Sequence, residues 1–319
     1  MRIGVFSDSL PKLERPEMLA WCAARGINDV EIGVGAWGPW PRPHLDLATI
    51  GERRERDRLA GELREFGVRL SAVNAAGNLL HPNPTKRSDH QARFRAAVDL
   101  AVDLGVKRVV TMSGCPAGAG GGALSIFPSW ATSADDEKIF AWQMENELIP
   151  FWRATSDWLA KEAPEVMVCF EMHPGVTIFS SAGFEALAPH VGRNIGLNLD
   201  PSHFWWQGID PITVVEAFGD RIGHMHGKDT LLYPDRIRKL GVLHFAPPAD
   251  PTQAPWHFVS VGEGHDDATW TRLLRAAQAA GYDGVISIEH EDPRCDGEEG
   301  TKRSLAGLQR ALAPLAAAA

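Results

Sequence analysis

Eight short β-rich runs alternate with helical patterns along the 319-residue chain, and this alternation constrains the fold more than any other feature. The runs cover residues 2–7, 29–34, 69–74, 108–113, 166–171, 195–200, 222–227 and 284–289. Helical patterns cover residues 16–26, 56–67, 90–105 and 267–281, and all four end in glycine, as helices often do. The pattern predicts an α/β protein with a (β/α)8 TIM barrel, although an open doubly wound sheet has the same local alternation.

No break in composition and no linker divides the chain, so we predict a single domain over residues 1–319. Two connections are longer than ordinary barrel loops: residues 114–134 follow the fourth run, and residues 228–267 follow the seventh. Both begin at the C-terminal end of a strand, where such barrels place their active sites, so both are candidate lids. The glycines of the first connection fit neither a phosphate loop nor a dinucleotide fingerprint and favour a flexible hinge.

The composition excludes several classes of partner. A formal net charge of −9 and the lack of a basic run argue against a nucleic-acid or membrane partner. The first apolar run meets Asp8 too early for a secretion signal, and no run approaches the length of a membrane span. The four cysteines have no metal-binding or redox spacing. We therefore expect a reduced, cytoplasmic protein that acts on a small molecule.

Side chains that can bind a metal or move a proton follow four successive runs in the second half of the chain. They are Glu171 and His173, then Asp200 and His203, then His224, His226, Lys228 and Asp229, and finally Glu289, His290 and Glu291. The C-terminal ends of barrel strands meet at one rim, so a Glu, an Asp, a His and a Glu are expected to come together there. This oxygen-rich set suits Mn²⁺ or Mg²⁺ and tolerates Co²⁺ or Zn²⁺.

The pattern leaves some choices open. Residues two apart on a strand share a face, so Glu289 points with Glu291, and His226 points with His224; register alone does not say which member of each pair reaches the metal. Taken singly, a carboxylate after a strand is usually a helix N-cap, and a lone histidine is usually a hydrogen-bonded rim residue. Four successive strand ends of this kind favour a metal site over coincidence.

Several stretches resemble the xylose-isomerase-like barrel superfamily, often labelled sugar phosphate isomerase/epimerase. They are VEIGV, SAVNAAGNLLHP, FEMHPG, NLDPSHFWWQGID, HMHGKD and VGEGH with GYDGVISIEHED, which together span nearly the whole chain. The resemblance implies a divalent-metal site made by Glu171, Asp200, His226 and Glu289, and so selects Glu289 over Glu291. By analogy with ketose 3-epimerases of this family, Glu171 and Glu289 also act as acid and base, and His203 contacts substrate oxygens.

The chain departs from those epimerases at one position. They carry an arginine six residues after the metal-binding histidine, where this chain has Leu232. Its Lys228-Asp229 pair instead looks like the variant of inosose dehydratases and of the catalytic subunits of C-glycoside-cleaving enzymes. Endonuclease IV, another relative, needs further histidines where this chain has Asn74 and Ser113, which disfavours DNA repair.

The predicted function is a metal-dependent isomerase or epimerase that removes a proton next to the carbonyl of a sugar or keto-sugar, with Mn²⁺ as the favoured cofactor. The alternative is a β-eliminating lyase on a keto-inositol or 3-keto-glycoside, in which His173 or Lys228 joins as acid or base. His173 serves equally well as a residue that orients Glu171. A sugar-binding protein without turnover is the third alternative.

A neutral carbohydrate is the expected substrate, because the acidic residues after the eighth run would repel a phosphate. Asn78 and His81 are candidate contacts to hydroxyl groups, and Lys228 is a further candidate substrate ligand. Tryptophans 37, 40, 205 and 206 lie near predicted strand ends, where aromatic side chains also bind sugars. Of the adjacent pair, we expect Trp206 to border the sugar and Trp205 to pack below the rim. The sequence leaves open whether the protein forms a homo-oligomer or pairs with a small second subunit.

Overall fold

The structure is a computed structural model that describes residues 1–34, 44–45, 49, 51–128, 134–243 and 253–316. Eight parallel strands follow one another in the order β1-β10-β7-β6-β5-β4-β3-β2 and close into a barrel. They are β1 (Arg2–Phe6), β2 (Asp29–Gly33), β3 (Arg69–Asn74), β4 (Arg108–Met112), β5 (Met167–Glu171), β6 (Ile195–Leu199), β7 (Ile222–Gly227) and β10 (Val285–Ile288). Each predicted run is a strand to within one residue at either end, and the closed barrel replaces the open-sheet alternative.

The fold contains two compact units. The first unit comprises residues 1–31, 66–69 and 199–319, and the second comprises residues 32–65 and 70–198. The single domain over residues 1–319 stays a prediction. None of the described helices combines the length and the apolar character needed to cross a membrane.

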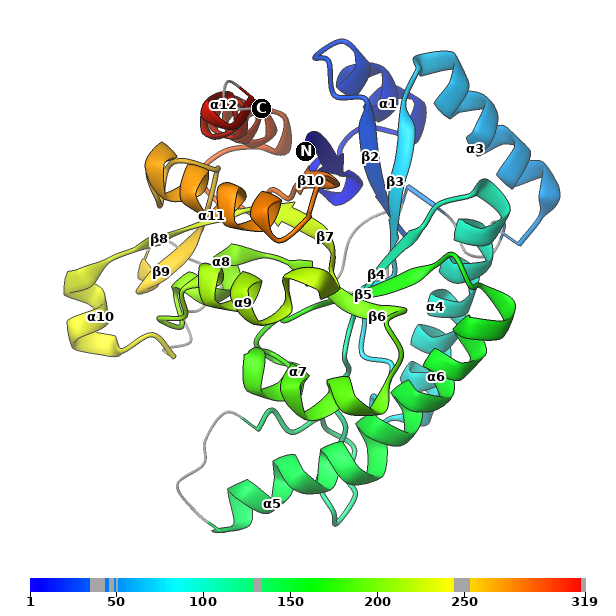
Figure 1. Ribbon diagram of the computed structural model, residues 1–319, viewed down its shortest axis with the longest axis vertical. Helices are drawn as coiled ribbons and strands as arrows, with labels where there is room; N and C mark the ends of the chain where they lie inside the picture. The colour runs from blue at the N-terminus through cyan, green and yellow to red at the C-terminus, as the bar shows by residue number, and fades with distance from the viewer. Residues whose placement is uncertain (35–43, 46–48, 50, 129–133, 244–252, 317–319) are drawn as a thin grey trace. The chain divides into compact units, whose positions relative to one another are not determined.

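In the first unit, β10 pairs with both β1 and β7, and Ser287 is in register with Gly4 on one side and His226 on the other. Its helices are α1 (Arg15–Ala23), α8 (Pro201–Trp205), α9 (Pro211–Phe218), α10 (Pro234–Leu240), α11 (Asp267–Ala279) and α12 (Gly297–Ala316), with short 3₁₀ turns at Ser7–Ser9 and Gly219–Arg221. Helices α11 and α12 pack side by side (Figure 1). This unit therefore carries the ends of β7 and β10 and the chain that follows β6.

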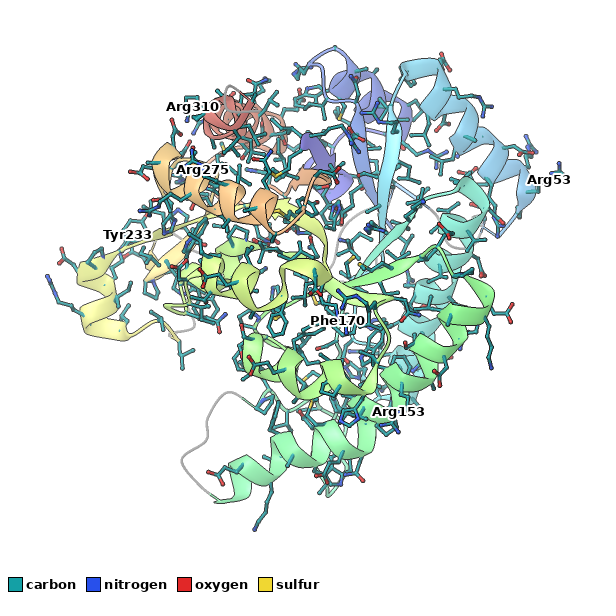
Figure 2. All side chains as sticks on the ribbon, viewed as in Figure 1. Arg53, Arg153, Phe170, Tyr233, Arg275 and Arg310 are labelled. Atoms are coloured by element: carbon teal, nitrogen blue, oxygen red, sulfur yellow. The ribbon has the colours of Figure 1, made fainter. Side chains whose placement is uncertain are left out.

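In the second unit, β4 pairs with β3 and β5, and β5 pairs with β6. Its helices are α3 (Arg53–Phe66), α4 (Pro84–Leu104), α5 (Ala134–Gln143), α6 (Ile149–Glu162) and α7 (Ser181–Leu187), with a π-helical turn at Met144–Leu148 and a 3₁₀ turn at Ala188–His190. Phe170 is a buried residue of its core (Figure 2), and its ring centroid lies 4.3 Å from that of Trp152 and 6.4 Å from that of Phe184.

Capping residues explain where the longest of these helices begins and ends. Helix α4 starts after Asn83, whose side chain accepts hydrogen bonds from the backbone N–H groups of Thr85 and Lys86. It ends at Gly105, which adopts the left-handed conformation with φ of 69°. The glycine predicted to end this helix therefore does so.

The long connection after β7 is folded rather than irregular. Strands β8 (Asp229–Leu232) and β9 (Trp256–Val259) form an antiparallel pair, here called the β8–β9 hairpin, and α10 follows β8 (Figure 1). One residue, Lys228, separates β7 from β8. The sequence analysis did not predict these strands, and a role as a lid stays a prediction.

The connection after β4 is described as far as residue 128. The side-chain amide of Gln143 donates hydrogen bonds to the carbonyl oxygens of Pro116 and Ile126, at 3.1 and 2.8 Å. Gly121 and Gly122 have φ of 72° and 139°, a region that favours glycine, and they lie at a tight turn that Gly121 closes with Gly118. The glycines thus serve a turn tied to α5, while a hinge function stays a prediction.

Candidate metal centre

Asp200 uses its two carboxylate oxygens for different tasks. The apolar strand β6 ends at Leu199, and Oδ1 of Asp200 then accepts a hydrogen bond from the backbone N–H of Ser202 at 2.9 Å, which caps α8. Oδ2 lies 3.1 Å from Nζ of Lys228 and 3.3 Å from Nε2 of His203. Asp200 therefore caps α8, as a carboxylate after a strand usually does. The cap uses only Oδ1, so Oδ2 can still contact Lys228 and His203.

His226 presents its two ring nitrogens to different carboxylates. Its Nδ1 lies 2.9 Å from Oε2 of Glu289 and 3.9 Å from Oδ2 of Asp200. Its Nε2 lies 3.2 Å from both carboxylate oxygens of Glu31. One ligand atom from each of Asp200, His226 and Glu289 lies within 4.8 Å of the others, and all three side chains are largely buried. The first unit thus brings three of the predicted metal ligands together.

The two glutamates after β10 differ in depth. Oε2 of Glu289 contacts Nζ of Lys228 at 2.7 Å in addition to His226, and its side chain is 13% exposed. Glu291 contacts the same ammonium at 3.0 Å and is 34% exposed. The ring of His290 lies against Gly300 of α12, away from this set. Glu289 is therefore the more deeply buried of the two glutamates, and its role as a metal ligand stays a prediction.

Charge controls the protonation of these groups. Burial opposes the ionisation of both carboxyl groups. The Lys228 ammonium and His226 nevertheless lower the pKa of Glu289 to about 2. In the same way, Lys228 and His203 hold the pKa of Asp200 well below its usual range. Burial and the Lys228 charge lower the pKa of His203 to about 4. Burial opposes protonation of His226, but Glu31 and Glu289 raise its pKa well above the ordinary value. At neutral pH the two ligand carboxylates are thus ionised and His203 is neutral.

The donor set fits a divalent cation. Two ionised carboxylates and an imidazole Nδ1 converge in a buried place, and oxygen-rich sets of this kind bind Mn²⁺, Mg²⁺, Co²⁺ or Zn²⁺. The Lys228 ammonium lies within hydrogen-bonding distance of both Asp200 and Glu289 and shows that these carboxylates accommodate positive charge. The set is therefore chemically suited to a metal.

The remaining predicted site residues on β5 and β3 lie in the second unit. Glu171 is the last residue of β5, is buried, and is in register with Asn198, two residues before Asp200. His173 is half-buried, and its Nδ1 donates to the carbonyl oxygen of Pro174. His81 accepts a hydrogen bond from the backbone N–H of Asn83 at 2.9 Å.

Asn78 is engaged within the protein. Its amide nitrogen donates to the carbonyl oxygen of Cys115 and to Oγ of Ser125, and its carbonyl oxygen accepts from the backbone N–H groups of Cys115 and Leu80. Three of these hydrogen bonds, those with Cys115 and Ser125, tie the connection after β3 to the connection after β4. The structure gives Asn78 this connecting role, and its contact with a substrate hydroxyl stays a prediction.

The adjacent indoles of Trp205 and Trp206 face different partners, and a contact of either with a sugar stays a prediction. Trp205 stacks on His265 with ring centroids 3.9 Å apart, and Trp206 stacks on Trp256 of β9 at 4.5 Å. Trp206 is 8% exposed, so a carbohydrate contact would need its edge rather than the stacked face. Trp37 and Trp40 lie outside the described residues.

The β8–β9 hairpin adds an aromatic side chain that the sequence analysis missed. The ring of Phe258 lies 5.2 Å from that of His203, and Nζ of Lys228 lies 4.6 Å from its centroid. The short strand that carries Phe258 follows a Pro-rich stretch without a clear period, so the sequence offered no signal for its position.

Glu31 is the second residue that the sequence analysis missed. It lies within β2, where all five residues are buried, and its Oε2 is 2.8 Å from Nε2 of His224. A single carboxylate inside an apolar strand is an available signal, because a buried charge requires partners. Glu31 finds them in His224 and His226.

Three comparisons place the chain among known proteins. A protein of Bacillus subtilis (strain 168) described as "Uncharacterized protein YfiH" is 32% identical over 321 residues, which cover 98% of this chain and 99% of that protein. A solved structure of the IolI protein with a bound zinc atom has a TM-score of 0.67 and 19% identity, covering 98% of this chain and 99% of that one. The probable 3-DHS dehydratase AsbF of Bacillus anthracis has a TM-score of 0.66 and 14% identity, covering 97% and 99%. The model of the xylose isomerase-like TIM barrel family matches residues 19–311, and the chain belongs to that family.

Proposed function

We propose that this protein is a divalent-metal-dependent enzyme that removes a proton from the carbon next to the carbonyl of a sugar or keto-sugar, and thereby isomerises or epimerises it. The observation that carries the proposal is the convergence of Asp200, His226 and Glu289 in a buried place that favours positive charge. Family membership supports it, since the family is described as xylose isomerase-like.

Glu171 is the proposed fourth ligand. It ends β5, and the resemblance of the sequence to xylose-isomerase-like barrels implies a ligand at this position. The zinc atom bound by the IolI protein supports a metal in this fold. We propose Mn²⁺ as the ion, because three carboxylates and one imidazole form a mainly hard donor set, with Mg²⁺, Co²⁺ and Zn²⁺ as alternatives to be compared.

The bound metal would act as a Lewis acid that polarises the substrate carbonyl. Glu289 is ionised at neutral pH, as a ligand or a base must be, and we assign proton transfer to Glu171 and Glu289. His203 is neutral and buried beside Asp200, so its imidazole is placed to hydrogen-bond a substrate oxygen without adding charge. His173 is assigned to orient Glu171 or to share its proton.

Lys228 supports a second candidate, a lyase that expels a β-substituent after the same proton abstraction. Its buried ammonium lies 2.7 Å from Glu289 and is placed to give a proton to a leaving group. Leu232, at the position where ketose 3-epimerases carry arginine, lies on β8 opposite Trp256 in the hairpin. A keto-inositol or a 3-keto-glycoside is the substrate class for this candidate.

The two candidates differ in what leaves the substrate. The purified protein is loaded with Mn²⁺ and incubated in deuterated water with a ketose and with a 3-keto-glucoside that carries an aglycone. Exchange of a carbon-bound proton without release of the aglycone supports the isomerase or epimerase, and release supports the lyase. Asp200→Asn is the inactive control. If the protein binds metal but neither exchanges a proton nor releases an aglycone, the sugar-binding alternative replaces both.

The proposed substrate is an uncharged carbohydrate. Glu291 and Asp292 follow β10 at the place where barrels of this type usually bind phosphate, and their charges disfavour an anionic group. The net charge of −9 likewise disfavours nucleic acid. Parallel assays with a sugar and its phosphate ester check this proposal, because a lower KM for the ester would contradict it.

A further inference from the structure

Glu31, which has no role in the proposed reaction so far, lies at the centre of a buried hydrogen-bonded group. Its side chain is fully buried in β2, its Oε2 is 2.8 Å from Nε2 of His224, and both of its oxygens are 3.2 Å from Nε2 of His226. The same nitrogen of His224 lies 3.0 Å from Oγ of Ser287. The carboxylate thus holds two histidines of β7 at once.

The geometry of His226 shows what this contact does. The ring of Phe6 stacks on the imidazole with centroids 5.8 Å apart and an angle of 12° between the planes, which fixes the plane of the ring. Within that plane Nε2 faces Glu31 and Nδ1 faces Glu289. A carboxylate accepts hydrogen bonds and cannot donate one when ionised, so an N–H on Nε2 is the form that satisfies Glu31.

We propose that Glu31 is a positioning residue that keeps a hydrogen on Nε2 and fixes the ring orientation of His226, so that Nδ1 is the nitrogen left to bind a metal. The inference rests on the proposed metal-dependent function. A metal-binding histidine commonly donates its other N–H to a carboxylate, and loss of that partner typically weakens metal binding about 10- to 100-fold. Glu31 acts through His226 and is not itself a ligand in this proposal.

A competing arrangement exists on the same residues. Glu31, His224 and His226 offer ligand atoms within 4.8 Å of one another and so form a second candidate metal group. In that arrangement Nε2 of His226 would itself bind a metal ion and would have to lose its hydrogen. The same ring would then bind metal ions through both of its nitrogens. The contacts of 2.8 to 3.2 Å are ordinary hydrogen-bond lengths, which favours the positioning role.

The first test compares Glu31→Gln with a matched variant, Asp29→Asn. Asp29 is a buried carboxylate two residues earlier on β2, and it pairs with Arg2 and Arg69 instead of a histidine. We expect calorimetric titration with Mn²⁺ to show one site per wild-type chain, a dissociation constant about 10- to 100-fold higher in Glu31→Gln, and a change of less than about 2-fold in Asp29→Asn.

The outcomes separate the two proposals. Wild-type binding with unchanged affinity in Glu31→Gln overturns the positioning role alone. Two sites in the wild type and one in Glu31→Gln overturn it in favour of a ligand role. No metal binding by the wild type overturns the proposed function and this inference together.

The second test begins with the wild-type protein, so its first result does not depend on the folding of a variant at residue 31. The wild-type protein is loaded with Co²⁺, whose unpaired electrons shift the proton resonances of its ligands far from the ordinary spectrum. We expect one shifted N–H resonance that disappears slowly after transfer to deuterated water, because the Nε2–H of His226 is buried and hydrogen-bonded. Glu31→Gln should speed that exchange while leaving the shift of the other ligand protons in place. Absence of an exchangeable shifted resonance in the metal-loaded wild type would contradict the proposal.

Discussion

A residue near the start of the chain is held in an unusual electrostatic environment. Asp8 follows β1, and burial together with the negative charges of Glu289, Glu31 and Glu291 raises the pKa of its carboxyl to about 7, against the effect of the Ser7 hydroxyl. The folded protein therefore binds a proton at Asp8 at pH values where the unfolded chain does not. This contribution to stability is complete below about pH 4 and is lost as the pH rises toward 7.

We predict that Asp8→Asn removes this pH dependence. In the presence of a chelator, the variant should match the wild type near pH 4 and exceed it by about 2 kcal/mol at pH 8, since each pKa unit corresponds to about 1.4 kcal/mol and partial exposure reduces the effect. Urea unfolding at pH 4, 6 and 8 measures the difference. A constant difference across that range would show that Asp8 does not titrate in this interval.

At the scale of elements, Asp229 anchors the β8–β9 hairpin to the turn that precedes α11. Its buried carboxylate accepts hydrogen bonds from the backbone N–H groups of Gly262, Gly264 and His265, at 3.0 to 3.2 Å, and from the indole N–H of Trp270 at 3.0 Å. A side chain at Gly264 would collide with the carbonyl oxygen of Thr230. The sequence VGEGH is thus suited to wrap closely around one acidic residue.

We predict that Asp229→Asn destabilises the protein by about 2 to 4 kcal/mol. The substitution replaces one carboxylate oxygen, which accepts hydrogen bonds, by an NH₂ group, which donates them. The buried N–H groups around position 229 then lose an acceptor and face another donor. The matched control is Asp235→Asn on α10, an exposed residue paired with Arg238, which should cost less than about 0.5 kcal/mol. Urea unfolding gives both values. Near-UV circular dichroism of Trp270 checks the local structure, and equal losses in the two variants would contradict the anchor.

At the scale of the whole molecule, a metal that binds only the folded state raises the melting temperature. With Mn²⁺ at about 100 times its dissociation constant the gain is about 2.7 kcal/mol, which corresponds to a rise on the order of 5 °C for a chain of this size. Asp200→Asn should lose this rise while Oδ1 still caps α8. Asp210→Asn, at the N-cap of the neighbouring α9, should keep it. Calorimetric scans with Mn²⁺ and with chelator test the pair, and a rise retained by Asp200→Asn would remove Asp200 from the ligand set.

The whole barrel was predictable from sequence because its strands are short apolar runs separated by periodic helices, and these patterns are local. The choice between Glu289 and Glu291 was not, because strand alternation places both on one face, and their depth depends on contacts with His226 of β7 and with Lys228, which follows β7. Glu31 was missed for the same reason, since its partners are nearly two hundred residues away in the chain. The β8–β9 hairpin is missing from the prediction because its four-residue strands are too short to show a period.

Lys228 alone joins β7 to β8, and this junction restricts how the chain can change in length. His226 faces the candidate ligands, and Asp229, three residues later, holds the turn before α11. In extended backbone, one inserted residue reverses the direction of every side chain that follows, so it would turn either the imidazole or the anchoring carboxylate away from its partners. The alignments of related chains that keep both partners should therefore contain no insertion or deletion between the histidine and the aspartate.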